Sequence, residues 1–271
     1  MPELPEVETT LRGIAPHING QLIDDIIVRQ PMLRWPIPVH ELQQVRQQRI
    51  ESVTRRGKYL LLGTAHGTLI IHLGMSGSLR ITRPDVPPAK HDHVDLIFHN
   101  GTCLRLRDPR RFGAVLWTLD DVQQHPLLAE LGPEPLSDEF DTEYLFVRTR
   151  KRKQAIKPLL MDSHIVVGVG NIYANEALFR AGIRPALAAG RISRSRLQVL
   201  VNAIKTVLSE AIEQGGTTLR DFTASDGQPG YFKQRLFVYD RAGEQCSICG
   251  MTIKHLRQGQ RASYYCPACQ T

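Results

Sequence analysis

The chain has 271 residues, 42% of them hydrophobic and 23% charged, a composition that excludes a disordered chain and allows two or three folded domains. Its 34 Lys and Arg residues outnumber its 27 Asp and Glu residues, which gives a net charge of +7 and favours a polyanionic partner. The N-terminus has no apolar signal segment and no apolar run approaches the ~20 residues of a membrane span, so we expect a cytoplasmic protein without a membrane part.

The first third of the chain is predicted to form β-structure behind a short helix. Pro5 suits the first turn of a helix, and Val7, Thr10, Leu11 and Ile14 would form one apolar face. Short, partly alternating apolar segments follow, separated by Gly, Pro and Asn residues. Such segments favour a β-sandwich or a flattened barrel. They are Leu22–Val28, Ile50–Arg55, Lys58–Leu62, Thr68–Leu73, His93–Phe98 and Thr102–Arg107.

Helical periodicity dominates the second half of the chain. Residues 132–144 are acidic, contain two prolines and have no clear period, so we expect a linker there. Beyond it, apolar residues at i, i+3, i+4 and i+7 predict a long helix whose buried stripe is core packing. We expect Ser193 or Ser195 to cap its start and the glycines at 215 and 216 to end it. The stripe consists of Leu197, Leu200, Val201, Ile204, Val207, Leu208, Ala211 and Ile212.

Two Cys-x-x-Cys pairs lie near the C-terminus, Cys246 with Cys249 and Cys266 with Cys269. In a reducing compartment, cysteines in this arrangement are typical of metal ligands rather than of disulfides. Four thiolates with this spacing predict one closed, tetrahedral Zn²⁺ site with a structural role. The remaining cysteine, Cys103, lies alone in a predicted strand and is expected to be a small buried residue.

The segment between the two cysteine pairs is basic. It contains Lys254, His255, Arg257 and Arg261 without any acidic residue, and two tyrosines follow. A basic hairpin on a rigid metal site is suited to contacting a phosphate backbone. A solvated basic face is the alternative interpretation.

The extreme N-terminus offers a candidate nucleophile. Methionine before proline is normally removed, which would leave Pro2 with a free secondary amine. An α-amine has a pKa near ~8, so a substantial neutral fraction exists at physiological pH. Attack of a secondary amine on a sugar C1′ gives an iminium cation that can act as an electron sink, and Glu3 and Glu6 lie close enough in sequence to move protons. Taken alone, this stretch also fits an ordinary acidic helix start.

Eight motifs in one order carry a resemblance to a known family. They are MPELPEVET at the N-terminus, RRGKYLLL at 55–62, HLGMSG at 72–77, KHDHVD at 90–95, DPRRFG at 108–113, IKPLLMD at 156–162, GVGNIYANE at 168–176 and QRASYYCPAC at 260–269. Together they resemble the formamidopyrimidine-DNA glycosylases of bacterial 8-oxoguanine repair. The resemblance runs from residue 2 to about residue 270.

This resemblance implies an α+β multidomain architecture. Residues 2–131 would form an N-terminal β-sandwich catalytic domain with a leading helix, and residues 132–144 the linker. Residues 145–236 would form a helical domain with a helix–two-turn–helix element, and residues 237–271 a zinc-finger β-hairpin with one structural Zn²⁺. Double-stranded DNA containing oxidised purines or abasic sites would lie between the lobes of a bacterial enzyme that we expect to be monomeric and to associate with the nucleoid.

The resemblance also implies four catalytic residues. Pro2 displaces the base at C1′ and forms a Schiff base, and Glu3 protonates the sugar ring oxygen or otherwise helps to open the ring. Lys58 matches a lysine that donates a proton and contacts phosphate during β-elimination, although a solvated cation would also fit the basic turn. Arg261 matches an arginine that grips the phosphates beside the lesion and assists δ-elimination. The expected reaction is base excision followed by strand cleavage on both sides of the sugar.

DNA contacts follow in the same way. A base inside a duplex must be flipped out, and Met75, Arg110 and Phe112 match the residues that fill the gap. In isolation, Met75 and Phe112 would be interpreted as core residues. Positions that match phosphate or nucleotide contacts are His91, Arg110, Arg152, Lys157 and Asn171.

Two further features qualify the resemblance. The family position aligned with Arg152 is usually lysine, so the charge is kept while a point donor becomes a fork, and we expect DNA binding to survive. The polar stretch Thr217–Tyr231 is too long for a routine connection. It corresponds to the segment that folds over a flipped 8-oxoguanine in this family, where backbone amides would read the lesion.

Two alternatives are weighed against this interpretation. Endonuclease VIII, the sister enzyme for oxidised pyrimidines, shares the proline nucleophile. It typically begins PEGPE rather than PELPE, and it tends to cluster its wedge residues in one loop. A non-catalytic DNA-binding protein on the same scaffold would not need Pro2, Glu3, Lys58 and Arg261 together.

Overall fold

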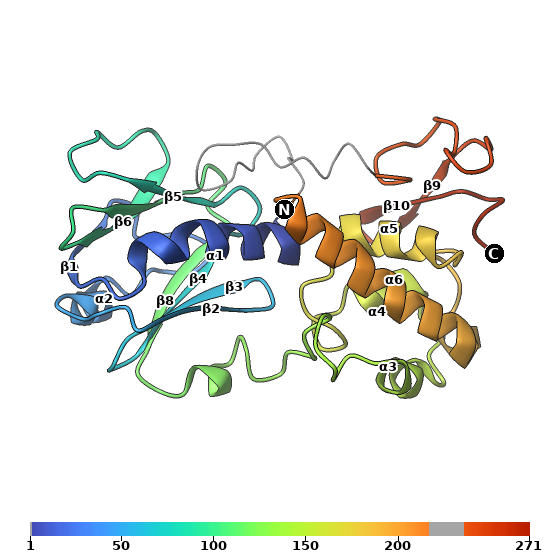
Figure 1. Cartoon of the computed structure of the whole chain (residues 1–271), viewed down its shortest axis with the longest axis horizontal. Coiled ribbons are helices and arrows are strands. Elements are labelled where there is room, and N and C mark those ends of the chain that lie inside the picture. Colours follow the sequence, from blue (N-terminus) through green and yellow to red (C-terminus); the bar gives the residue numbers. More distant parts are fainter. Residues whose placement is uncertain (1, 217–235) are drawn as a thin grey trace. The chain divides into compact units, whose positions relative to one another are not determined.

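The structure is a computed structural model that describes residues 2–216 and 236–271 (Figure 1). Among these residues, two compact units form: residues 2–130 with 214–216, and residues 131–213 with 236–271. No helix in the described part of the chain combines the length and apolarity that crossing a membrane requires. The predicted lesion-capping stretch Thr217–Tyr231 lies outside the described residues.

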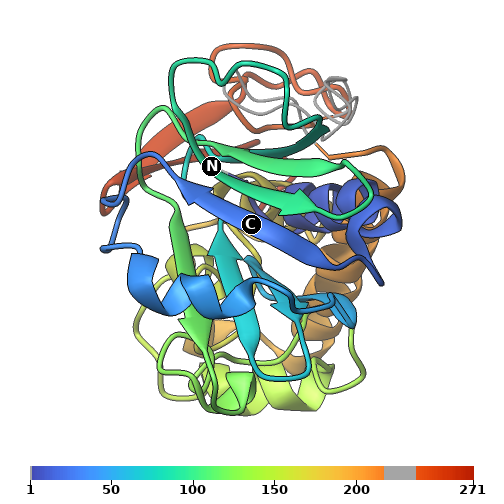
Figure 2. The same cartoon turned by 90° about the vertical axis from the view of Figure 1, so that its left-hand side faces the viewer.

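The first unit is a β-sandwich that follows the long helix α1 (Leu4–Ile18). All of its strand pairs are antiparallel, and Figure 2 shows the two sheets as separate layers. One sheet has the order β1 (Ile23–Val28), β6 (Asp92–Phe98), β7 (Cys103–Arg107) and β5 (Ser78–Thr82). The other has the order β2 (Ser52–Arg56), β3 (Tyr59–Gly63), β4 (Thr68–His72) and β8 (Ala114–Thr118). Short helical turns are α2 (Val39–Leu42), η1 (Gln43–Val45) and η2 (Val122–Gln124).

All six predicted strands are present, with ends within two residues of the predicted bounds. Two strands, β5 and β8, were not predicted. Among the described strands, each lies at the edge of its sheet and pairs with one neighbour. The position of such an edge strand is therefore set by a partner far away in sequence. A segment of five residues is too short for its hydrophobic pattern to identify it as a strand.

Apolar side chains from both sheets meet α1 in one core. Val7, Ile14 and Ile18 on α1 are fully buried, which confirms the predicted apolar face, although Leu11 is only half-buried. Pro5 lies in the first turn of the helix, where a missing N–H costs nothing. Cys103 is buried in β7, as expected for a residue that is not a metal ligand.

A buried ion cluster inside the β1-β6-β7-β5 sheet was not predicted. The guanidinium of Arg105 is completely buried and binds both carboxylate oxygens of Asp95 at 2.8 Å, while Arg29 binds Asp95 at 2.6 Å. Burial by itself would raise the pKa of Asp95, but the hydrogen bonds from Arg29 and Arg105 outweigh it and hold that pKa below its ordinary value. The alternating sequence pattern hid this cluster because charged residues in strands usually face water.

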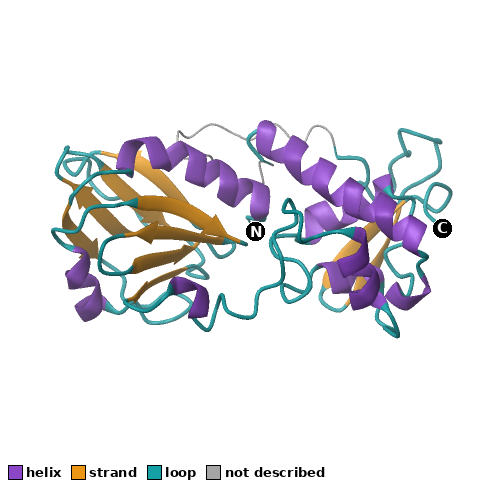
Figure 3. Ribbon diagram, turned by 60° about the horizontal axis from the view of Figure 1, so that its bottom comes forward, coloured by secondary structure: helices purple, strands orange, loops and turns teal. Residues whose placement is uncertain are grey.

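The second unit contains the remaining helices and a β-hairpin (Figure 3). The helices are α3 (Thr142–Thr149), α4 (Ile156–Leu160), α5 (Asn171–Arg180), η3 (Ala189–Arg191) and α6 (Arg194–Glu213), and the hairpin pairs β9 (Lys254–Gln258) with β10 (Arg261–Tyr265). Helix α6 buries the whole predicted stripe. The Ser193 hydroxyl accepts from the Arg196 N–H at 3.4 Å, and Gly215 and Gly216 follow with positive φ, as predicted.

Helix α3 begins inside the segment predicted to be a linker. Asp141 caps it by accepting a hydrogen bond from the Tyr144 N–H at 2.7 Å. The acidic, proline-containing composition of residues 132–144 concealed this N-cap, because Asp favours both turns and helix starts.

Candidate functional site

The first candidate residues lie at the start of α1. Pro2 is buried, and Glu3 is the N-cap in extended conformation with only 2% of its surface exposed. The Glu6 carboxylate accepts the Glu3 backbone N–H at 2.9 Å in a reciprocal capping box. This box fixes the conformation of the residue that follows Pro2. Two buried carboxylates thus lie within one helical turn of the candidate nucleophile.

Lys58 lies in the hairpin turn between β2 and β3. Arg56 pairs with Tyr59, so Gly57 and Lys58 form a two-residue turn, and Gly57 has a φ of +56°. Glycine at the first position is what a type II′ hairpin turn requires, because that position needs a left-handed conformation. The sequence therefore presents Lys58 at the tip of a tight, defined turn.

Arg55 joins this turn to α1. Its Nε donates to Glu8 on α1 at 2.9 Å, and its Nη1 donates to the Gly57 carbonyl at 2.8 Å. Burial by itself would raise the pKa of Glu8, but hydrogen bonds from Arg55 and Arg12 lower it below its ordinary value. One guanidinium therefore ties the Lys58 turn to the helix that begins with Pro2 and Glu3. The motif RRGK signalled a basic turn but not this tie.

His72, at the end of β4, was not singled out from the sequence. Burial, followed by the charges of Lys58 and Arg34, lowers its pKa to about 4. Its Nδ1 accepts the Gly74 N–H at 3.0 Å, so a neutral imidazole holds the start of the next loop. That loop is the one that carries Met75.

The predicted gap-filling residues come from two loops of the same unit. Met75 is half-buried in the loop between β4 and β5, while Arg110 and Phe112 are exposed in the loop between β7 and β8. The Arg110 guanidinium carbon lies 5.1 Å from the centre of the Phe112 ring. A Cβ placed on Gly74 would stand 2.3 Å from the backbone carbon of Phe112, so the two loops touch backbone to backbone.

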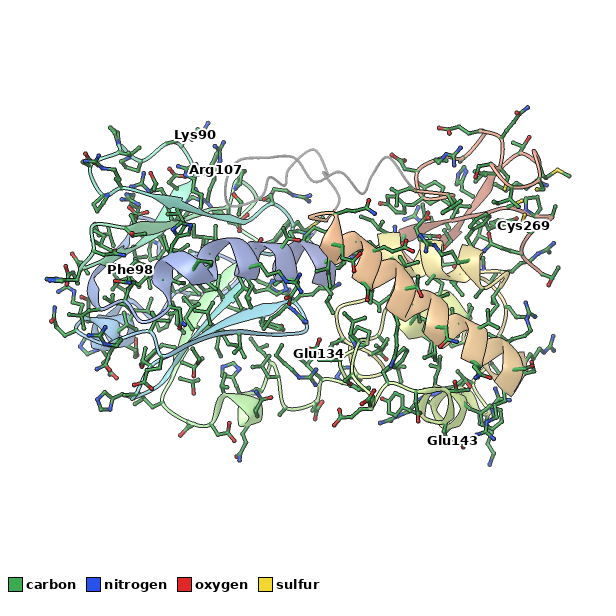
Figure 4. The ribbon with its side chains drawn as sticks, in the orientation of Figure 1. Lys90, Phe98, Arg107, Glu134, Glu143 and Cys269 are labelled. Carbon is green, nitrogen blue, oxygen red and sulfur yellow. The ribbon has the colours of Figure 1, made fainter. Side chains whose placement is uncertain are left out.

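His91 lies immediately before β6 with a φ of +77°, at the end of an exposed loop that includes Lys90 (Figure 4). The Asp108 N–H donates to its carbonyl at 3.0 Å. All seven site residues predicted in the first half of the chain, from Pro2 to Phe112, therefore fall within one compact unit.

The remaining predicted residues belong to the second unit. Arg152 is exposed after α3, within a basic turn. Asn171 is the first residue of α5, where backbone N–H groups favour anions, and its buried Oδ1 has no hydrogen-bond partner among the described residues. Lys157 differs from the expectation of a nucleotide contact in one respect. It is 1% exposed, and its ammonium donates to the Ala262 carbonyl and the Ser263 hydroxyl, both at 2.7 Å.

The four predicted metal ligands come together in the second unit. The Sγ atoms of Cys246, Cys249, Cys266 and Cys269 all lie within 4.8 Å of one another, with Cys249 and Cys266 at 3.4 Å and Cys246 and Cys269 at 3.9 Å. Four sulfurs around one Zn²⁺ at about 2.3 Å would be separated by about 3.8 Å. The cluster therefore fits the predicted structural Zn²⁺; Figure 4 labels Cys269 beside the hairpin.

Arg261 is the first residue of β10 and is exposed. It pairs with Gln258 across a two-residue turn that begins with Gly259 at a φ of +58°. This is the same kind of turn that carries Lys58. Each unit thus holds one predicted catalytic cation at a hairpin turn that begins with glycine.

Sequence reasoning missed the buried groups that hold the cysteine hairpin. Glu176 on α5 accepts the backbone N–H groups of Phe237, Val238 and Tyr239 at 2.8–3.0 Å. Burial raises its pKa even though these donors oppose the rise. Asn175 accepts the Tyr264 N–H at 2.8 Å. A buried Asn-Glu pair inside an otherwise apolar helix, in the motif GVGNIYANE, was the available signal.

Comparison with family models agrees with this arrangement. The formamidopyrimidine-DNA glycosylase N-terminal domain matches residues 1–115, its H2TH domain matches residues 131–223, and the zinc finger found in FPG and IleRS matches residues 243–271. The chain belongs to the formamidopyrimidine-DNA glycosylase family. It is 60% identical to the family's enzyme from Methylococcus capsulatus and 59% identical to that from Pseudomonas putida, each over 270 residues and all of both chains.

Solved structures agree over nearly the whole chain. The MutM (FPG) protein of Thermus thermophilus has a TM-score of 0.89 at 38% identity, with 99% of this chain and 98% of that chain covered. Lactococcus lactis Fpg in complex with DNA containing an abasic site has a TM-score of 0.91 at 34% identity, with 99% of both chains covered. A complex of a Lactococcus lactis variant with Fapy-dG DNA has a TM-score of 0.92 at 34% identity, with both chains covered completely.

The predicted fold is confirmed: a β-sandwich with a leading helix, an H2TH helical domain and a zinc-finger hairpin. The activity is that of a DNA glycosylase and abasic-site lyase acting on oxidised purines. Full-length relatives carry the formamidopyrimidine name, and this sets aside the endonuclease VIII and non-catalytic alternatives.

Proposed function

We propose that the chain binds duplex DNA that contains oxidised purines or abasic sites and attacks the damaged nucleotide with the nitrogen of Pro2. The observation that carries this assignment is the geometry at the start of α1. Pro2 is buried, the buried Glu3 follows it, and the capping box with Glu6 fixes the backbone between them. Arg55 ties the Lys58 turn to the same helix.

The proposed reaction begins at the Pro2 nitrogen. The neutral Pro2 nitrogen forms a bond to C1′ while the bond from C1′ to the base breaks, and the base leaves with that electron pair and takes up the proton that the Pro2 nitrogen loses. Glu3 supplies the proton that opens the sugar ring. The resulting iminium draws electrons from C2′, where loss of a proton expels the 3′ phosphate. A second elimination, with loss of the C4′ proton, expels the 5′ phosphate.

Two cations assist the eliminations. Lys58 provides a proton donor and a phosphate contact at the tip of its turn. Arg261, exposed at the start of β10, contacts the phosphates that flank the lesion. When bound, Zn²⁺ holds the hairpin on which Arg261 is mounted. An exposed guanidinium beside a tight hairpin turn suits bidentate phosphate binding.

DNA contacts are assigned to exposed or half-buried positions. Met75, Arg110 and Phe112 fill the gap, and His91, Arg152 and Asn171 contact the backbone. Lys157 is buried against β10, so we assign it an indirect contribution through the hairpin that carries Arg261. Its other role, a direct contact to the damaged nucleotide, would require the ammonium to leave these two acceptors.

The domain division that accompanies this function is residues 2–131 for catalysis, 132–144 for the linker, 145–236 for the helical domain and 237–271 for the zinc finger. We expect the enzyme to work as a monomer in the bacterial cytoplasm, associated with the nucleoid when bound to DNA. The net charge of +7 supports that association.

Borohydride trapping tests the nucleophile and the substrate class together. The chain is incubated with a duplex carrying 8-oxoguanine opposite cytosine and with one carrying thymine glycol. We expect a covalent complex on the purine lesion that is abolished in Pro2→Gly and retained in Arg12→Ala, an exposed control on the same helix. Trapping that persists in Pro2→Gly would reject the nucleophile, and preferential trapping on thymine glycol would reject the substrate class.

A further inference from the structure

The loop that carries Met75 and the loop that carries Arg110 and Phe112 both bond to one buried carboxylate, that of Asp108, and the His91 segment bonds to the Asp108 backbone. The Ser76 hydroxyl, from the Met75 loop, donates to Asp108 Oδ1 at 2.7 Å. The Gly113 N–H, at the end of the loop that carries Arg110 and Phe112, donates to Asp108 Oδ2 at 2.7 Å. The backbone N–H of Asp108 donates to the His91 carbonyl at 3.0 Å.

A second layer of hydrogen bonds closes this arrangement. The Ser76 oxygen accepts the Arg110 N–H at 3.0 Å, so one hydroxyl bonds to both the carboxylate and the backbone of the other loop. His93 Nε2 lies 2.9 Å from the Asp108 carbonyl oxygen. Every oxygen of Asp108 thus has a partner, and those partners come from three separate segments of the chain.

Packing leaves this group little freedom. Asp108 is 0% exposed and Ser76 is 3% exposed. A Cβ on Gly113 would lie 2.9 Å from the Asp108 carboxylate and 2.8 Å from the His72 carbonyl. The neighbouring loops can therefore approach each other only because glycine stands at this position.

An aspartate at this buried position indicates a specific role, because burying a carboxylate costs free energy. In the described part of the chain, neutral donors rather than a cation satisfy Asp108. Hydrogen bonds to a charged acceptor are shorter and about twice as strong as neutral ones. An apolar residue would fill the same space but would remove both carboxylate bonds, to Ser76 and to Gly113, that join the two loops.

We propose that Asp108 and Ser76 form a brace that makes Met75, Arg110 and Phe112 one rigid wedge, and that both are positioning residues for nucleotide extrusion. This inference rests on the proposed gap-filling role of those three residues. A rigid wedge does not have to be ordered when it enters the duplex, so the entropy of fixing two loops is not subtracted from binding. Loosening the brace should therefore slow the reaction on duplex DNA and leave the chemistry at Pro2 unchanged.

The test compares Ser76→Ala with Ser78→Ala. Ser78 stands two residues further along, at the start of β5, and pairs through its backbone with Arg107. Each variant is assayed by borohydride trapping on 8-oxoguanine in a duplex and on an abasic site in a single strand, where no gap has to be filled. We expect Ser76→Ala to slow trapping on the duplex by roughly tenfold, in line with loss of one charge-assisted hydrogen bond, and to leave the single-strand rate unchanged. Ser78→Ala should match the unaltered chain on both substrates.

Asp108→Asn is the second variant. Its amide can still accept from the Gly113 N–H and donate to Ser76, so the fold should persist with weaker, neutral bonds and an intermediate loss on the duplex. In a Phe112→Ala background, Ser76→Ala should add little further loss, because the wedge is already incomplete. Melting temperatures of all variants establish that each is folded at the assay temperature.

Other results would overturn the brace. Equal duplex rates in Ser76→Ala and Ser78→Ala would mean that the hydrogen bonds do not position the wedge. Equal losses on duplex and single strand would mean that Ser76 supports the whole domain and not the wedge. Failure of the unaltered chain to trap on either substrate would reject the proposed function itself, which is a distinct outcome.

Discussion

The β-sandwich of the first unit and the cysteine hairpin of the second each present a basic residue on a glycine-led turn, but they hold that turn differently. Beneath Lys58 lies a large apolar core built from both sheets and α1. Around the hairpin that carries Arg261, the described residues form a small apolar cluster that includes Phe179, Val238 and Ile253. The remaining stabilisation comes from the four cysteines and from the buried polar groups of Lys157, Asn175 and Glu176. Where the apolar core is small, metal coordination and hydrogen bonds replace it, so loss of the metal should unfold this part of the chain.

The largest effect is expected from losing the metal. Cys246→Ser should remove Zn²⁺ and unfold the hairpin, because structural zinc contributes about 10–16 kcal/mol in small metal modules. DNA binding should fall at least ~100-fold when the Arg261 turn is lost, while circular dichroism retains the strand signal of the sandwich. Metal analysis and DNA titration measure these effects.

Cys103→Ala is the matched control for the metal site. Burial raises the pKa of the Cys103 thiol to about 11, so it stays protonated and does not act as a ligand. It should keep full zinc content. Loss of zinc in this control, or its retention in Cys246→Ser, would contradict the assignment of the cluster.

The buried ion cluster of the sandwich should give the next largest effect. Arg105→Ala leaves the buried Asp95 without its bidentate partner and should destabilise the fold by about 3–5 kcal/mol. Arg83→Ala, which breaks an exposed pair with Asp85, should cost less than about 1 kcal/mol. Urea denaturation of both variants measures the difference. Similar values would show that the sandwich depends on its apolar core alone.

His72 predicts a dependence of stability on pH. Its folded pKa of about 4 lies below the ordinary value of 6.5, so the unfolded chain binds the proton first as the pH falls. Stability is therefore complete above about pH 6.5 and lost toward pH 4, by roughly 3 kcal/mol. His72→Asn keeps an acceptor for the Gly74 N–H and should flatten this window in urea titrations. An unchanged slope would assign the acid sensitivity to other groups.

Lys157 tests how far buried hydrogen bonds stabilise the hairpin of the second unit. Lys157→Met removes the donor to Ala262 and Ser263 and should destabilise the second unit by about 1–3 kcal/mol. Zinc content should stay complete while DNA affinity falls, because the Arg261 turn is held less firmly. Lys153→Ala, an exposed cation nearby, should leave the melting temperature unchanged. A fall in affinity without any change in melting temperature would instead support direct contact of Lys157 with DNA.

The smallest effect is expected at Arg55. Arg55→Lys cannot bind Glu8 and the Gly57 carbonyl at once and should cost about 1 kcal/mol. β-Elimination should slow about fivefold with the substrate KM unchanged, because only the Lys58 turn is loosened. Arg12→Ala removes the other cation on Glu8 and serves as the control. Equal rates in the two variants would reject a positioning role for Arg55.

Sequence patterns predicted the features that depend on residues close together in the chain. The zinc ligands follow from two short spacings, and α6 follows from its apolar stripe and its terminal serine and glycines. The edge strands β5 and β8 escaped, because their pairing is decided by distant segments. The same holds for Asp108, whose partners lie up to 32 residues away, and for Lys157, whose acceptors lie 105 and 106 residues away. A sequence pattern identifies that such residues matter without indicating which way they point.

Under the proposed mechanism, the burial of Pro2 makes removal of the preceding methionine a step on which catalysis depends. Its nitrogen is an amine only after the preceding methionine has been cleaved, and before that step it is an amide without nucleophilic character. Because the residue is buried, access for an aminopeptidase is best while α1 is still emerging from the ribosome. Cells deprived of that peptidase should accumulate enzyme that folds, holds zinc and binds damaged DNA, yet never becomes covalently attached to it. Any fusion placed ahead of Pro2 should have the same effect.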